Sequence, residues 1–161
     1  MVTLARLSRW RSSRRTLDGL FDRIRSMKTE IFPGVYESLD KIAKYVSQAA
    51  HKAGLDPAEV YQVQLAVDEA CCNIIDHAYG GEGIGDIQLS LDVSNSNLTI
   101  VLKDQGEPFD PSELPPPQLN VPLEKMKVRG VGFYLMHKLM DEVRYEAEPG
   151  RGNTLTLVKR R

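Results

Sequence analysis

A carboxylate and a carboxamide, Glu69 and Asn73, stand four residues apart in the apolar stretch DPAEVYQVQLAVDEACCNIIDHAY at 56–79. On a helix, residues four apart lie one above the other, so both side chains would project from one face. Such a pair can also be two solvated residues or a local hydrogen bond, and the polar Asp76 and His77 follow closely. The spacing alone therefore does not single out a site.

Two further runs contain residue types that would complement this pair: DQGEPFDP at 104–111 and RGVGF at 129–133. Glycines that open a helix let backbone N–H groups approach an anion, so Gly130 and Gly132 could hold a polyphosphate. An aspartate that ends a buried strand can accept a hydrogen bond from an exocyclic amine, which would let Asp104 bind a purine such as adenine. Each run alone is a common turn or loop-to-helix junction.

A polyphosphate at these glycines would bring a divalent cation with it. Mg²⁺ prefers oxygen ligands and keeps several waters, which the carboxamide oxygen of Asn73 and phosphate oxygens would satisfy. Glu69, one helical turn earlier, would face the γ-phosphate and could orient or deprotonate an attacking hydroxyl. The segment 105–129, rich in Gly, Pro and charge, would be a lid that excludes water.

The composition indicates one folded domain with an uneven distribution of charge. The 161 residues are 42% hydrophobic and 27% charged, which suits a single domain with a core. The first 28 residues carry eight basic and two acidic side chains, leaving 13 basic and 20 acidic ones for 29–161. An acidic body argues against direct nucleic-acid binding. Adjacent Cys71 and Cys72 form no disulfide framework, and no apolar run could span a bilayer, so we expect a cytoplasmic protein.

The N-terminal extension, 1–28, is expected to be separate from the domain at 29–161. Apolar residues recur at helical spacing between 17 and 24. Three interpretations stay open: a disordered tail or an extension upstream of a start near Met27, an amphipathic helix on a membrane or partner, and a mitochondrial transit peptide. The first is preferred.

Hydrophobic periodicity predicts the helices that would position these side chains. Apolar residues recur at three- and four-residue intervals over 39–53, a helix that would end at Gly54. Asp56 as N-cap, Pro57 at the first helical position and Glu59 predict the start of a second helix, continuing to Tyr79. A third helix is expected over 130–140.

After the glycines at 80–85, a period of two residues predicts strands over 87–93 and 98–102, joined as an antiparallel hairpin. Further strands are expected over 29–32, 142–148 and 154–159. The order β, α, α, β, β, loop, α, β, β favours an α+β two-layer sandwich. Its sheet would be mixed but mostly antiparallel, with helices on one face.

Four stretches in this order resemble the boxes of one family: LAVDEACCNIIDHAY at 65–79, DQGEPFDP at 104–111, RGVGFYLMHKLMDEV at 129–143 and GNTLTL at 152–157. The chain from about residue 29 onwards is similar to the bacterial anti-sigma factor serine/threonine kinases. They belong to the histidine-kinase-like ATPase (GHKL) superfamily, with gyrase, heat-shock chaperones, histidine kinases and mismatch-repair ATPases. The resemblance implies a Bergerat-type ATP-binding fold.

The resemblance also implies roles for individual residues. Glu69 would be the catalytic base and Asn73 the Mg²⁺ ligand, while Asp104 would bind adenine. The remaining positions would surround the nucleotide, with Arg129 near the phosphates and Thr154 near the adenine: Gly106, Arg129, Gly130, Val131, Gly132 and Thr154.

The activity implied by the resemblance is ATP-dependent phosphorylation of a serine or threonine on an anti-anti-sigma antagonist, combined with sequestration of a sigma factor. The family also implies a homodimer. Two alternatives remain: an ATP-gated binding module without useful kinase activity, and an ATP-binding domain with another signalling partner.

Overall fold

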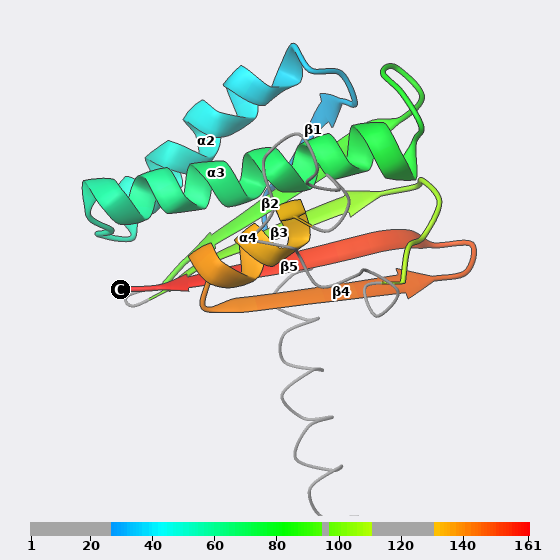
Figure 1. Ribbon diagram of the computed structural model, residues 1–161. Helices are drawn as coiled ribbons and strands as arrows, with labels where there is room; N and C mark the ends of the chain where they lie inside the picture. Colours follow the sequence, from blue (N-terminus) through cyan, green and yellow to red (C-terminus); the bar gives the residue numbers. More distant parts are fainter. Residues whose placement is uncertain (1–26, 95–96, 111–130) are drawn as a thin grey trace, which may run out of the picture.

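The computed structural model describes residues 27–94, 97–110 and 131–161, which form two layers (Figure 1). One layer is a sheet of strands β1 (Thr29–Pro33), β2 (Asp86–Val93), β3 (Asn97–Asp104), β4 (Glu142–Glu148) and β5 (Gly152–Arg160). The other contains helices α2 (Ser38–Lys52), α3 (Pro57–Asn73) and α4 (Val131–Leu139), with a π-helical turn, η1 (Ile74–Ala78), directly after α3. The helices lie on one face of the sheet (Figure 1).

The strand order is β1-β2-β3-β5-β4, and every pairing between the described strands is antiparallel. This confirms the predicted α+β two-layer sandwich. Because β5 pairs with β3, β4 occupies the edge although it precedes β5 in the sequence. The start of β5 therefore lies beside the end of β3, where Asp104 is the cross-strand partner of Asn153.

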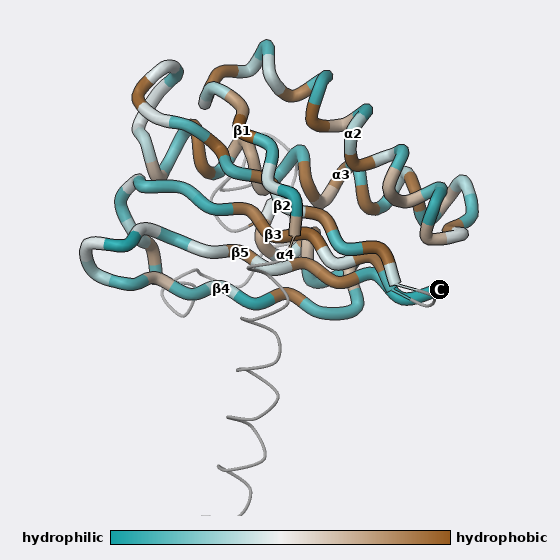
Figure 2. The backbone as a smooth tube through the Cα atoms, turned by 180° about the vertical axis from the view of Figure 1, so that it is seen from behind, coloured by the Kyte–Doolittle hydropathy of each residue, from teal (hydrophilic) through white to brown (hydrophobic). Residues whose placement is uncertain are grey.

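The hydrophobic core fills the space between the two layers. Hydrophobic positions concentrate on the central strands and on the helices, whereas the edge strand β4 is mostly hydrophilic (Figure 2), as suits a strand with one exposed side. The largest fully buried side chains include Ile42, Val46, Val63, Val67, Ile75, Ile87, Leu89, Ile100, Leu102, Met136 and Leu157.

The helix that carries Glu69 and Asn73 begins as its sequence predicts. The Asp56 side chain accepts a hydrogen bond from the Glu59 backbone N–H at 2.8 Å, and the Glu59 carboxylate accepts one from the Asp56 N–H at 2.8 Å. This reciprocal capping box satisfies two N–H groups that a helix terminus otherwise leaves without partners. Pro57 occupies the first helical position, where no N–H is needed.

The end of this helix differs from the prediction of one continuous helix to Tyr79. The α-helix ends at Asn73 and a wider π turn follows, in which the Tyr79 N–H reaches back to the Ile74 carbonyl at 2.9 Å. Both Ile74 and Ile75 stay buried in this turn. It also turns the Ala78 carbonyl towards the backbone N–H of Glu107, at 2.8 Å. Single π turns of this kind often occur at functional sites.

No helix in the described ranges is long and apolar enough to cross a membrane.

Candidate functional site

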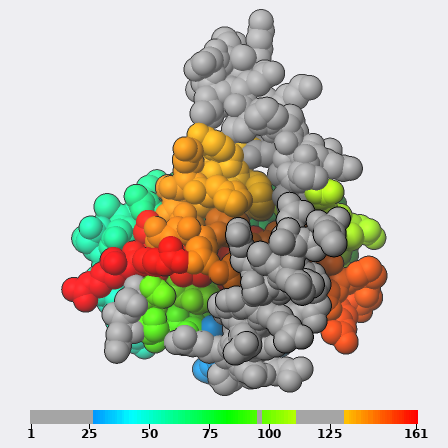
Figure 3. Space-filling model, turned by 90° about the horizontal axis from the view of Figure 1, so that it is seen from below, coloured from blue at the N-terminus to red at the C-terminus, as the bar shows by residue number. Residues whose placement is uncertain are grey.

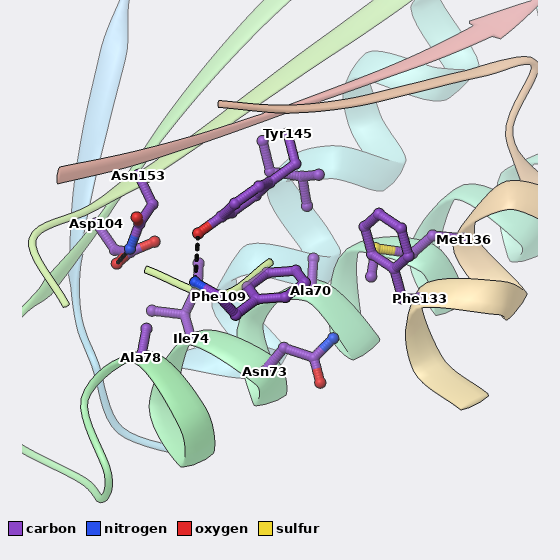
Figure 4. A pocket seen from close by; sticks show the side chains of 11 residues that line it. Ala70, Asn73, Ile74, Ala78, Asp104, Phe109, Phe133, Met136, Tyr145 and Asn153 are labelled. Carbon is purple, nitrogen blue, oxygen red and sulfur yellow. Dashed lines mark hydrogen bonds between the residues drawn. The ribbon is translucent and has the colours of Figure 1, made fainter. Parts of the chain in front are cut away.

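A pocket lies between the helical layer and the ends of three strands (Figure 4). Helix α3 and η1 form one wall, α4 forms a second, and β3, the loop after it, β4 and β5 supply the remainder. The lining side chains are mostly apolar, with three polar groups among them: Ala70, Asn73, Ile74, Ala78, Asp104, Phe109, Phe133, Met136, Tyr145, Asn153 and Leu155. Such a composition is typical of a site for a small organic ligand.

Asp104, the last residue of β3, is 6% exposed and provides the buried carboxylate of the pocket. Its Oδ1 accepts hydrogen bonds from the Gly106 N–H at 2.9 Å and from Asn153 Nδ2 at 2.8 Å. Its Oδ2 accepts none from the described residues. Burial raises the pKa of Asp104, and the two hydrogen bonds oppose that shift. The structure thus presents an oriented hydrogen-bond acceptor, as the sequence predicts.

The segment after Asp104 is pressed against η1, and this explains Gly106. A Cβ added to Gly106 would lie 2.5 Å from the carbonyl carbon and oxygen of Ala78, so no larger residue fits without movement. The hydrogen bond from the Glu107 N–H to the Ala78 carbonyl joins the same two segments. Gly106 therefore joins two of the predicted motifs by close backbone packing.

Aromatic side chains fill much of the pocket. The Phe109 ring lies 4.3 Å from the Tyr145 ring and 5.7 Å from the Phe133 ring, edge-on to the latter. The Phe109 N–H also donates to the Tyr145 hydroxyl at 3.1 Å (Figure 4). Three aromatic rings, those of Phe109, Phe133 and Tyr145, therefore line the pocket in contact with one another.

Glu69, Asn73 and Gly132 meet at the start of α4, which forms part of the molecular surface (Figure 3). A Cβ added to Gly132 would lie 2.6 Å from Glu69 Oε2 and 3.5 Å from Asn73 Nδ2. A larger residue at position 132 would therefore require the Glu69 carboxylate to move. Burial, and secondarily the charge of Asp68, raise the pKa of Glu69. The three residues thus lie close together, and their joint action stays a prediction.

A site for ATP and Mg²⁺ requires an oxygen ligand for the metal and hydrogen-bond donors for the phosphates. Asn73 lines the pocket and carries a hard oxygen ligand, and Gly132, the second residue of the nine-residue helix α4, lies beside Glu69 and Asn73. The described residues contain no group of three His, Cys, Asp or Glu that could hold a metal ion. A cation held by Asn73 and phosphate oxygens needs no such group, so the residues present fit.

The remaining predicted residues differ in their placement. Arg129, Gly130 and most of the expected lid lie outside the described residues, and Val131 is the first residue of α4. Thr154 does not line the pocket, because it stands between Asn153 and Leu155, which do, and successive strand residues face opposite sides of the sheet.

Sequence reasoning missed Asn153, Phe109 and Tyr145. Asn153 and Phe109 lie within the quoted motifs, but no spacing rule distinguishes them there. Tyr145 belongs to an alternating strand whose alternation does not say which face is inward.

Comparison with known proteins gives a family for this geometry. A model of the histidine kinase-like ATPase domain matches residues 32–159. The chain belongs to this family. The match starts in β1, ends in β5 and includes every residue that lines the pocket. The resemblance noted in the sequence is thereby confirmed.

Several proteins similar to this chain bear the name serine-protein kinase RsbW. The protein from Bacillus licheniformis is 32% identical over 122 residues, which cover 73% of this chain and 76% of the relative. The protein from Bacillus subtilis (strain 168) is 30% identical over 122 residues, covering 73% and 76%. The protein from Bacillus cereus (strain B4264) is 28% identical over 135 residues, covering 81% and 83%.

Proposed function

We propose that this chain is an ATP- and Mg²⁺-dependent serine/threonine protein kinase that acts as an anti-sigma factor. It would phosphorylate an anti-anti-sigma antagonist and sequester a sigma factor, as a cytoplasmic homodimer. The observation that carries the proposal is the close approach of Glu69, Asn73 and Gly132 to one another, because Asn73 also lines the pocket that contains Asp104. The similarity to proteins named serine-protein kinase supports it.

The chemistry assigns each residue a separate task. Asp104 would bind the amino group of adenine, and the N–H groups at the start of α4 would face phosphate oxygens. Mg²⁺ would neutralise phosphate charge, with Asn73 as its protein ligand. Glu69 would position the substrate hydroxyl and accept its proton as the oxygen bonds to the γ-phosphorus and ADP leaves. Its raised pKa improves Glu69 as a proton acceptor.

The first test is phosphotransfer with Glu69→Gln. The protein is incubated with ATP, Mg²⁺ and a candidate antagonist domain, and mass spectrometry records a phosphate-sized increase in the antagonist. We expect Glu69→Gln to lose phosphotransfer while binding ATP with an affinity close to wild type, because the amide keeps the shape but accepts no proton. Asp40→Asn, which removes an exposed carboxylate that pairs with Lys44, is the control and should retain activity.

A fully active Glu69→Gln variant would exclude Glu69 as the base. If the wild type binds ATP and partner but transfers no phosphate to any candidate, the binding-module alternative is correct.

The second test concerns Asn73 as metal ligand. Isothermal titration of ATP with and without Mg²⁺ should show that Mg²⁺ strengthens binding to the wild type and that Asn73→Ala loses most of that gain. Affinity without Mg²⁺ should change little, because the carboxamide would contact the metal and not the base. An unchanged Mg²⁺ effect in Asn73→Ala would assign the metal to another residue.

A further inference from the structure

Asn153 is a buried amide with an unusual concentration of hydrogen bonds. It is 3% exposed and lies directly beside Asp104 in the sheet. Its Nδ2 donates to Asp104 Oδ1 at 2.8 Å, to the Gly106 carbonyl at 3.1 Å and, at the longer distance of 3.4 Å, to the Glu107 carbonyl. One side chain from β5 thus contacts both the carboxylate of the pocket and the loop that follows it.

This arrangement determines which oxygen of Asp104 is available to a ligand. Oδ1 is held by Asn153 and by the Gly106 N–H, so Oδ2 is the oxygen with free acceptor capacity. Within the described ranges, no cation forms an ion pair with Asp104. The neighbouring titratable groups are the phenols of Tyr79 and Tyr145, and burial raises the pKa of both, so they stay uncharged at neutral pH.

We propose that Asn153 is a positioning residue that makes the pocket select a 6-aminopurine over a 6-oxopurine. The proposal rests on the nucleotide-binding function proposed above. A carboxylate oxygen fixed as an acceptor binds an amino N–H and repels an oxo group, whose lone pairs face its own. With the Asn153 amide removed, Asp104 can rotate or take up a proton, and either change weakens the discrimination.

The loop itself does not depend on Asn153 alone. Gln105 Nε2 donates to the Arg151 carbonyl at 3.0 Å and the Glu107 N–H donates to the Ala78 carbonyl at 2.8 Å, so two other hydrogen bonds hold this segment. Of these contacts, only that from Asn153 reaches the carboxylate. Gln105 therefore offers a matched control, because Gln105→Ala removes a hydrogen bond between the same two segments without touching Asp104.

The test measures dissociation constants of ATP and inosine triphosphate, which differ at the 6-position, for the full-length protein with Mg²⁺ at neutral pH. The wild type should prefer ATP, and Asn153→Ala should lower that preference about tenfold, the typical effect of one hydrogen bond to a charged group. Asn153→Asp should lower it at least as far, because two adjacent carboxyls must share a proton. Asn153→Thr, which keeps a hydroxyl donor, should retain much of the preference, and Gln105→Ala should retain all of it.

Several results would overturn the proposal while nucleotide binding stands. One is a wild type that binds ATP and inosine triphosphate with equal affinity. Another is that Asn153→Ala and Asn153→Asp weaken the binding of ATP and of inosine triphosphate by the same factor. A third is that Gln105→Ala lowers the preference for ATP as much as Asn153→Ala does. If Asn153→Ala does not fold, the contrast between Asn153→Thr and Asn153→Asp decides the question. A wild type that binds neither nucleotide would overturn both this proposal and the proposed function.

Discussion

Glu69 is partly buried, and this burial disfavours the ionised form of its carboxylate. Desolvation at the junction of α3 and α4 raises its pKa, and no cation compensates within the described residues, since none of the ion pairs there includes Glu69. A carboxylate held in this way is a stronger proton acceptor than one in water, which suits the proposed role. The same environment lowers the stability of the nucleotide-free protein, because the ionised form is unfavourable there.

Because burial disfavours the ionised Glu69 carboxylate, the stability of the folded protein depends on pH in a predictable direction. Because the pKa is raised in the folded protein, the folded state binds the proton more tightly than the unfolded state, and stability is lost as pH rises above the ordinary value of 4.5. Glu69→Gln should therefore have a higher Tm than the wild type near neutral pH. Below the ordinary pKa both states of the wild type are protonated, and the difference should vanish.

Circular dichroism melting curves between acidic and neutral pH would measure this difference. Asp40→Asn, which removes an exposed carboxylate, controls for the change in net charge. A Glu69→Gln variant that is less stable than the wild type at neutral pH would show that the carboxylate stabilises the fold.

At the scale of elements, the two ends of α3 differ: the first turn is stabilised by a cap, and the last turn contacts the pocket. Its first turn is secured by the capping box, and its buried residues anchor it against the sheet and α2. Its last turn carries Asn73, and the π turn that follows shifts the backbone so that Ala78 meets the loop after β3. The helix therefore begins at a capped turn and ends at the pocket.

Asp56→Ala is expected to lower the free energy of unfolding by about 1 kcal/mol, because the Glu59 N–H loses its acceptor. Urea denaturation followed by circular dichroism would measure the change. Phosphotransfer should stay close to wild type, since Glu69 lies several turns from the cap. Asp40→Ala is the control: its partner is Lys44, with side chains 77% and 72% exposed, and it should cost less than about 0.5 kcal/mol. If Asp56→Ala and Asp40→Ala lowered the free energy of unfolding by the same amount, the predicted contribution of the capping box would be wrong.

At the scale of the whole molecule, the pocket exists because the sheet order brings distant segments together. β5 inserts between β3 and β4, so Asn153 lies beside Asp104 while Tyr145, on the edge strand, reaches Phe109. Helix α4 closes the pocket from the helical layer through Phe133 and Met136. Six helices and strands and the loop after β3 thus supply the walls, and none of them could form the pocket alone.

Local sequence was sufficient for the element types and for the residues at the centre of the proposed chemistry. The capping box of Asp56 and Glu59, the alternation in β2 and β3, and the Glu69–Asn73 spacing depend on residues close together in the chain. Their energetics are local, so a pattern in the sequence is enough to predict them. The glycines at 106 and 132 were also found from sequence, although the reason for each, a neighbouring backbone or carboxylate, is visible only in the fold.

Other features depend on contacts between segments far apart in the chain. Asn153 and not Thr154 faces the pocket because the pairing of β5 with β3 determines which alternate residues point to the helices, and a shift of one residue would reverse this. The helix that should have continued to Tyr79 becomes a π turn where it meets the loop after β3. Phe109 enters the pocket because Tyr145 and Phe133 converge on it. Periodicity carries no information on these contacts, since they arise only when the sheet and the helices pack together.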